Sequence, residues 1–189
     1  MMRIAASEEV IEVIARTRHW LETAVIGLDL CPFARTVHLK DQIRYAVSRA
    51  EAPEALLEDL LTELQALAAA DPEETETTLL IHPGVLTDFL DYNDFLGVAE
   101  AAVADLDLKG VLQVASFHPR YQFAGTGPDD IENYTNRSPY PTLHLLREAS
   151  VERAVAAFPD TAQIYEKNIV TLRHLGHEGW RRLGVGQEP

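Results

Sequence analysis

A chain of 189 residues can enclose one hydrophobic core, so we expect a single domain over residues 1–189. Hydrophobic residues make up 47% and charged residues 24% of the sequence, which excludes the composition of a disordered protein. The formal net charge of -14 makes this an acidic protein and argues against nucleic acid or an anionic membrane as a partner.

The N-terminal segment carries glutamates within its first ten residues and no uninterrupted apolar run. We therefore expect neither a signal peptide nor a membrane span. Cys31 is the only cysteine, so an internal disulfide cannot form. Both observations favour a soluble, cytoplasmic protein.

Apolar residues at helical spacing predict a first helix that begins behind Ser7 and ends at Cys31, because Pro32 disfavours helical geometry in the residue before it. Residues 42–47 alternate with a period near two, which is typical of a strand. A second helix is predicted from Pro53 to about Asp71, where a dense leucine stripe runs along one face.

The middle of the chain continues this alternation. Residues 77–81 form a short apolar run rich in β-branched residues, which predicts a buried strand. A helix over residues 95–106 and a strand over residues 111–117 follow. Alternating strands and helices favour an α/β fold with a small, mostly parallel central sheet of about three strands, flanked by helices. An α+β ferredoxin-like sheet is the alternative.

The chain after Phe117 predicts a long loop over residues 118–137, which is longer than most connections and therefore typical of a functional segment. Its aromatic and apolar residues predict that it is anchored. Ser138 and Pro139 then resemble a helix start, followed by one bent or two short helices. A last C-terminal helix is predicted over residues 161–175, and residues 184–189 should be frayed.

Two predicted strands end in the same dipeptide, His82-Pro83 and His118-Pro119. In a parallel sheet both histidines would emerge at the carboxyl edge, where open α/β folds bind ligands. His118 is the stronger candidate for an acid or base because it opens the long loop. A metal held by both histidines and a carboxylate is disfavoured, since no metal-binding motif is present, and no cofactor is indicated.

Arg137 and Ser138 lie where the loop is predicted to become a helix. A guanidinium group, a capping hydroxyl and the free amides of a helix N-terminus would together favour a carboxylate or phosphate. The alternative is that Arg137 pairs with a surface acid and Ser138 only caps the helix. On the predicted helix, His144 shares a face with Tyr140, Arg147 and Glu148, either as a polar wall beside the loop or as a surface pair.

Cys31 allows two interpretations. It would act as a nucleophile if His118 or His82 lay near enough to generate a thiolate. A buried, inert thiol is the commoner outcome for a lone cysteine, and a place at a helix C-terminus would raise its pKa.

Three long blocks resemble a bacterial family known only as a domain of unknown function. They are residues 27–34 (GLDLCPFA), 117–123 (FHPRYQF) and 136–148 (NRSPYPTLHLLRE). The resemblance covers nearly the whole chain but carries no established reaction, cofactor or catalytic residue. It does direct attention to the candidate residues that fall within the blocks, namely Cys31, His118, Tyr121, Asn136, Arg137, Ser138, His144, Arg147 and Glu148.

These features favour an enzyme, or a former enzyme, acting on a small anionic metabolite. His118, Cys31 and His144 are its catalytic candidates. The substrate-binding candidates are Tyr121, Asn136, Arg137, Ser138, Arg147 and Glu148. The alternative is a non-catalytic ligand-binding or assembly protein in which the same polar blocks stabilise the long loop. The two hypotheses differ in whether Cys31, His118 and Arg137 open onto one pocket.

Overall fold

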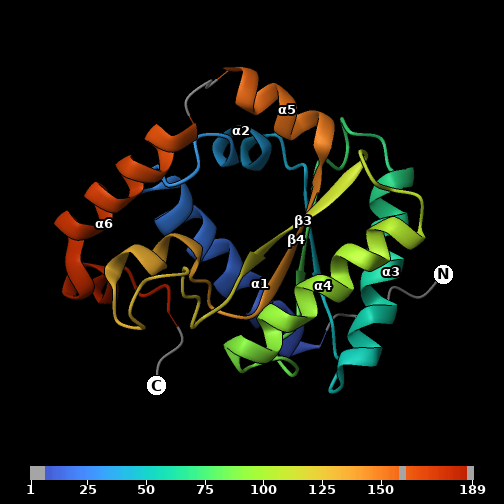
Figure 1. Cartoon of the computed structure of the whole chain (residues 1–189), viewed down its shortest axis with the longest axis horizontal. Coiled ribbons are helices and arrows are strands. Elements are labelled where there is room, and N and C mark those ends of the chain that lie inside the picture. Colours follow the sequence, from blue (N-terminus) through green and yellow to red (C-terminus); the bar gives the residue numbers. More distant parts are fainter. Residues whose placement is uncertain (1–6, 158–160, 187–189) are drawn as a thin grey trace.

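The computed structural model describes residues 7–157 and 161–186. In chain order its elements are α1 (Glu8–Trp20), the π-helix η1 (Leu21–Ile26), α2 (Ala34–Leu39), β1 (Ile43–Val47), α3 (Pro53–Ala69), β2 (Thr77–Ile81), α4 (Phe89–Asp105), β3 (Leu112–Phe117), the 3-10 helix η2 (Ile131–Asn136), β4 (Thr142–Arg147), α5 (Glu148–Ala157) and α6 (Thr161–Arg182). Figure 1 shows α3 and α4 on one side of the sheet, with α1 and α6 on the other.

The strands form one mixed sheet in the order β1-β2-β4-β3. β1 pairs with β2 in parallel, whereas β4 is antiparallel to both β2 and β3. It follows that β1, β2 and β3 all point the same way. Thr142 at the start of β4 lies opposite both Ile81 and Phe117, so the carboxyl ends of β2 and β3 meet at the same edge of the sheet.

The prediction of an α/β fold with a central sheet flanked by helices is therefore correct. The prediction that this sheet is mostly parallel is wrong, because two of its three strand pairings are antiparallel. It missed the fourth strand, which separates β2 from β3 and makes the sheet mixed. The ferredoxin-like alternative assumed that one connection fails to cross over. Both connections through α3 and α4 do cross over, because they join strands that point the same way.

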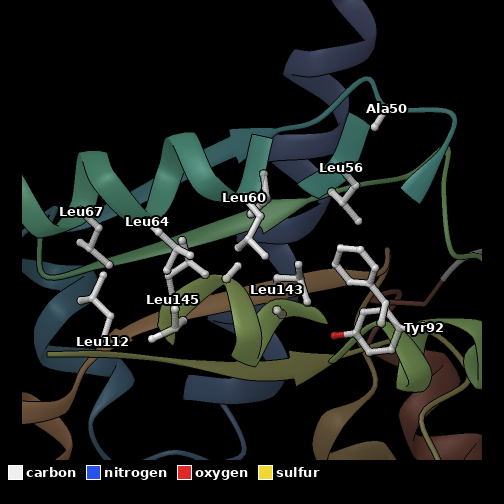
Figure 2. Packing of buried hydrophobic residues seen from close by; sticks show 14 of the residues in the cluster. Ala50, Leu56, Leu60, Leu64, Leu67, Tyr92, Leu112, Leu143 and Leu145 are labelled. Atoms are coloured by element: carbon white, nitrogen blue, oxygen red, sulfur yellow. The ribbon is translucent and has the colours of Figure 1, made fainter. Parts of the chain in front are cut away.

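The leucine stripe of α3 builds the larger core. Leu56, Leu60, Leu64 and Leu67 recur at helical spacing and are fully buried against the sheet. Leu112, Leu143 and Leu145 meet them from β3 and β4, and Tyr92 of α4 lies at the end of this cluster (Figure 2). The opposite face of the sheet is covered by a second cluster from η1 and α6, in which Trp20 lies edge-on to Phe117.

The helix predicted to begin at Ser138 is wrong, because residues 142–147 form β4. Leu143 and Leu145 alternate toward α3, as a strand requires. Leu146 falls three residues after Leu143, and this spacing imitates a helical stripe. Only the later part of the predicted helical segment is helical, as α5.

Helix ends differ from the prediction in three other places. The helix predicted to end at Cys31 ends at Trp20 as α1 and continues as η1 only to Ile26. α4 begins at Phe89 because the Asp88 carboxylate accepts hydrogen bonds from the amides of Leu90 and Asp91. α6 continues to Arg182 beyond a kink at Gly176, where φ is 66°. Val185, in the segment predicted to fray, is buried, and residues 187–189 lie outside the described residues.

Among residues 7–157 and 161–186, no helix combines the length and apolar character needed to cross a membrane.

Candidate functional site

A cavity of about 1170 Å³ lies at the edge of the sheet where β2 and β3 end. One part of its wall comes from the loops at this edge, through Pro83, Thr87, Pro119 and Arg120 and through the residues that lead into β4. The other part comes from α1 and from the segment of α6 beyond its kink. The cavity therefore lies between two parts of the fold. One is the carboxyl edge of the sheet, which the sequence predicts as a binding site, and the other is formed by α1 and α6.

His82 and His118 lie at this same edge, as the sequence predicts. Both pack against Tyr92 of α4, with ring centroids 5.8 Å and 5.0 Å from the tyrosine ring. The hydroxyl of Tyr92 donates to the carbonyl of Thr142 and accepts from the amide of Phe117, so it ties the ends of β3 and β4 together. Neither histidine lines the cavity, although the prolines that follow them do.

Both ring nitrogens of His118 are bonded to the main chain. Nε2 donates to the carbonyl of Leu86 at 3.1 Å, and Nδ1 accepts from the amide of Arg120 at 3.0 Å. These two bonds require the neutral ring with its proton on Nε2. Burial lowers the pKa of His118 to about 4, and the positive charges of Arg120 and Arg137 act in the same direction.

His82 is fully buried, and its Nδ1 donates to the carbonyl of Val85 at 3.0 Å. Its Nε2 is an acceptor without a hydrogen-bond partner among the described residues. Burial lowers the pKa of His82 to about 4, so its ring is also neutral near pH 7.

Arg120 and Arg137 bring positive charge to the cavity without an acidic partner in the described chain. Arg120 donates to the carbonyl of Thr87 at 3.0 Å. Arg137 donates to the carbonyls of Tyr121 and Pro128, at 3.2 Å and 2.5 Å. Because carbonyl groups are neutral, these bonds fix the guanidinium groups and leave their charges uncompensated.

The other charged groups of the cavity are also mainly basic. Arg16 lies on α1, and Arg181 lies on α6. Glu12 is the single carboxylate among the lining residues and pairs with Arg16 at 3.0 Å. In a protein of net charge -14, this cavity concentrates positive charge where the rest of the molecule is acidic.

The long loop that carries Arg120 and Arg137 is anchored by Asn133, in agreement with the prediction from its sequence. The Asn133 side chain is fully buried. Its Oδ1 accepts from the amide of Phe123 and the hydroxyl of Thr126, and its Nδ2 donates to the carbonyl of Gly127. The loop therefore holds a fixed shape by satisfying its own polar groups.

Three further candidates lie in the same region and hold the loop in place. The Tyr121 ring packs on Phe89, with centroids 5.3 Å apart. The Asn136 side chain donates to the carbonyl of Ser116. Ser138 lines the cavity, but its hydroxyl donates to the carbonyl of Tyr140 at 2.7 Å.

The predicted combination of Arg137 with a helix N-terminus is wrong, since no helix begins at Ser138. Arg137 nevertheless lines the cavity, and its guanidinium group lies 4.3 Å from the centre of the Tyr134 ring. The predicted pairing of Arg137 with a surface acid is also absent from the described residues, because both of its bonds reach carbonyl groups.

His144, Arg147 and Glu148 do not join the cavity. They do not form one helical face with Tyr140, because His144 and Arg147 lie on strand β4. The His144 Nε2 donates to the hydroxyl of Thr77 at 2.8 Å, and burial lowers the pKa of His144 to about 4. Arg147 donates to three carbonyls around the end of α3, and Glu148 begins α5.

Cys31 lies in the hydrophobic cluster between η1 and α6 and does not line the cavity. Burial raises the pKa of its thiol. The amides of Phe33 and Ala34 oppose this effect, while the charge of Asp29 adds to it. The structure therefore does not open Cys31, His118 and Arg137 onto one pocket.

Sequence reasoning missed Arg16, Arg120 and Arg181 as candidates. Arg120 could have been found, since it belongs to the block that contains His118. Arg16 and Arg181 come from opposite ends of the chain, and no local pattern connects them. Within the described ranges, no group of three or more His, Cys, Asp or Glu side chains gathers as metal ligands do.

Comparison with known proteins identifies a family for this chain, and that family has no assigned activity. No curated protein and no solved structure matches the chain. The model of the family described as "Protein of unknown function (DUF1415)" matches residues 12–182, and the chain therefore belongs to this uncharacterised family.

Proposed function

We propose that this protein binds a small anionic molecule in the cavity at the carboxyl edge of β2 and β3. Arg120 and Arg137 are its principal anion-binding side chains. One observation carries the proposal: the cavity is lined by four arginines and a single glutamate, although the whole chain has a net charge of -14. An anion approaching an acidic protein needs such a local cluster of cations.

The bonding of Arg120 and Arg137 supports the same function. Both are oriented by main-chain carbonyls, and Arg137 also lies over the Tyr134 ring. A guanidinium group that is positioned in advance loses little conformational freedom when it binds a carboxylate or phosphate. Its remaining N–H donors are available to the ligand.

We propose binding rather than acid–base chemistry as the role of the cavity. Each nitrogen of the His118 ring has a main-chain partner, so neither is available to a substrate proton without breaking a bond. The raised pKa of Cys31 likewise works against a nucleophilic thiolate. The alternative of a non-catalytic ligand-binding protein is thus better supported than an enzyme.

Calorimetric titration with phosphate, citrate and octanoate tests the proposal. The parent protein should bind at least one of these anions, and Arg137→Gln should weaken that binding roughly ten- to a hundredfold, as expected when a charge-assisted hydrogen bond is removed. Arg153→Gln is the matched control, because Arg153 lies on α5, does not line the cavity and pairs with Glu76. Failure of all three anions to bind, or equal affinity in the parent and Arg137→Gln, would remove this function.

A further inference from the structure

The wall of the cavity combines its cations with apolar residues. Four of its residues are prolines, namely Pro83, Pro119, Pro139 and Pro141. Proline has no backbone N–H, so the main chain at these positions cannot donate to an anion. Tyr134 and Trp180 add aromatic rings whose centroids lie 5.1 Å apart. The wall therefore suits an apolar body, and its arginine side chains supply positive charge for the charged groups of a ligand.

The uncompensated cations lie on two separate elements. Arg120 and Arg137 belong to the loop after β3, and both line the cavity. Arg181 belongs to α6 beyond the kink at Gly176. It is exposed and has no acidic partner among residues 7–157 and 161–186. Arg16 contributes less to this second position, because Glu12 offsets its charge.

A single inorganic ion would use only a small part of this cavity. The volume of about 1170 Å³ is comparable with pockets that enclose whole organic ligands, which range from about 300 to 1,000 Å³. A phosphate or sulfate held by Arg120 and Arg137 would also leave the charge of Arg181 and the apolar wall unused.

We infer that the ligand is an organic dianion whose two charged groups are separated by an apolar body. One end contacts Arg120 and Arg137, the other contacts Arg181, and the body lies against the proline and aromatic wall. The class is that of α,ω-dicarboxylates and their analogues. This inference rests on the proposed function and specifies which anion that function concerns.

The test compares suberate with octanoate, a monocarboxylate with the same number of carbon atoms. Suberate differs from octanoate in having a second carboxylate in place of the terminal methyl group, so tighter binding of suberate reports that carboxylate. Suberate should bind at least about tenfold more tightly, because one additional charge-assisted hydrogen bond contributes that much or more. Succinate and sebacate extend the comparison to shorter and longer spacings, and one length should bind best.

Two variants locate the two ends of the dianion. Arg181→Gln should abolish the advantage of suberate and leave the affinity for octanoate unchanged, whereas Arg137→Gln should weaken both ligands. Arg182→Gln is the matched control for Arg181, because Arg182 is its exposed neighbour, pairs with Glu178 and does not line the cavity. This control should bind suberate as the parent does.

The outcomes separate this inference from the proposed function. Equal affinity for octanoate and for every dicarboxylate, with both lost in Arg137→Gln, would overturn the dianion and retain an anion site. An advantage of suberate that survives in Arg181→Gln would also overturn it. Absence of binding by octanoate and by every α,ω-dicarboxylate would overturn the inference, and the phosphate and citrate titrations would then decide the proposed function separately.

Discussion

The Nδ1 of His118 accepts a hydrogen bond from the amide of Arg120 at 3.0 Å, while the Nε2 of the same ring donates to the carbonyl of Leu86. One neutral imidazole thus connects the loop after β2 with the loop after β3. Both loops contribute to the cavity. The guanidinium group of Arg120 makes a second link between them by donating to the carbonyl of Thr87. His118 therefore holds the main chain of Arg120 in place, and we propose that it thereby positions the arginine for an anion.

Substitution of His118 tests this positioning role. We expect His118→Leu to weaken the binding of octanoate or suberate roughly three- to tenfold, because the amide of Arg120 loses its acceptor and the arginine loses its fixed position. His118→Asn should retain more affinity, since its side-chain oxygen can take the place of Nδ1. Calorimetric titration of folded protein measures both effects.

His174→Asn is the control for this substitution, because His174 is an exposed histidine of α6 outside the cavity. It should leave affinity unchanged. Equal affinities in His118→Leu and the parent would show that Arg120 does not depend on His118.

Three histidines make the folded state sensitive to acid. Burial lowers the pKa of His82, His118 and His144 from 6.5 to about 4. Between about pH 6.5 and pH 4 the unfolded chain consequently binds more protons at these positions than the folded chain. Their contribution to the free energy of unfolding is complete above pH 6.5 and is lost as the pH falls toward 4. Each contributes on the order of 1 to 3 kcal/mol.

Urea denaturation at pH 7 and pH 5 measures this contribution in the parent and in His144→Gln. The glutamine can still donate to Thr77, the partner of His144, but it does not titrate. The many carboxylates titrate similarly in both proteins, so their effect cancels in the difference. The parent should lose more stability than the variant on acidification. Parallel losses would contradict a lowered pKa at His144.

Most of the secondary structure could be predicted because periodicity and capping are local properties. Residues 77–81 form β2 as predicted, and the leucine stripe after Pro53 forms α3. β4 could not be recognised in the same way, because Leu146 follows Leu143 at helical spacing and hides the alternation of Leu143 and Leu145. Its position between β2 and β3 depends on pairing across distant parts of the chain.

The candidate site could be predicted only in part, for a related reason. The ends of two predicted strands indicated where His82 and His118 lie. The block of residues 136–148 directed attention to Arg137, which lines the cavity. Arg181 reaches the same cavity only because α6 kinks at Gly176 and folds back beside α1, which no local pattern specifies. The role of His118 could not be inferred either, since it depends on two main-chain partners.

The anchor of the long loop gives a prediction about local stability. Asn133→Ala should leave the amide of Phe123 without a partner, at a cost of about 1 to 3 kcal/mol, and should remove one of the two hydrogen bonds to the carbonyl of Gly127. Hydrogen exchange should accelerate across residues 120–135 more than in the sheet. Thr135→Val is the control, because the buried hydroxyl of Thr135 has no partner among the described residues. Exchange in that variant should match the parent or be slower.

Cys31 provides a direct test of whether the protein uses a nucleophilic thiol. Burial raises the pKa of its thiol, which disfavours the reactive thiolate. Because Cys31 is the only cysteine, alkylation by iodoacetamide reports this one side chain. We expect the folded protein to react at least about tenfold more slowly than the urea-unfolded chain at the same pH, since burial also restricts access. Cys31→Ser should show no labelling and should bind octanoate as the parent does, because Cys31 does not line the cavity. A folded protein that reacts as fast as the unfolded chain, or faster, would instead identify an activated thiol and restore Cys31 as a catalytic candidate.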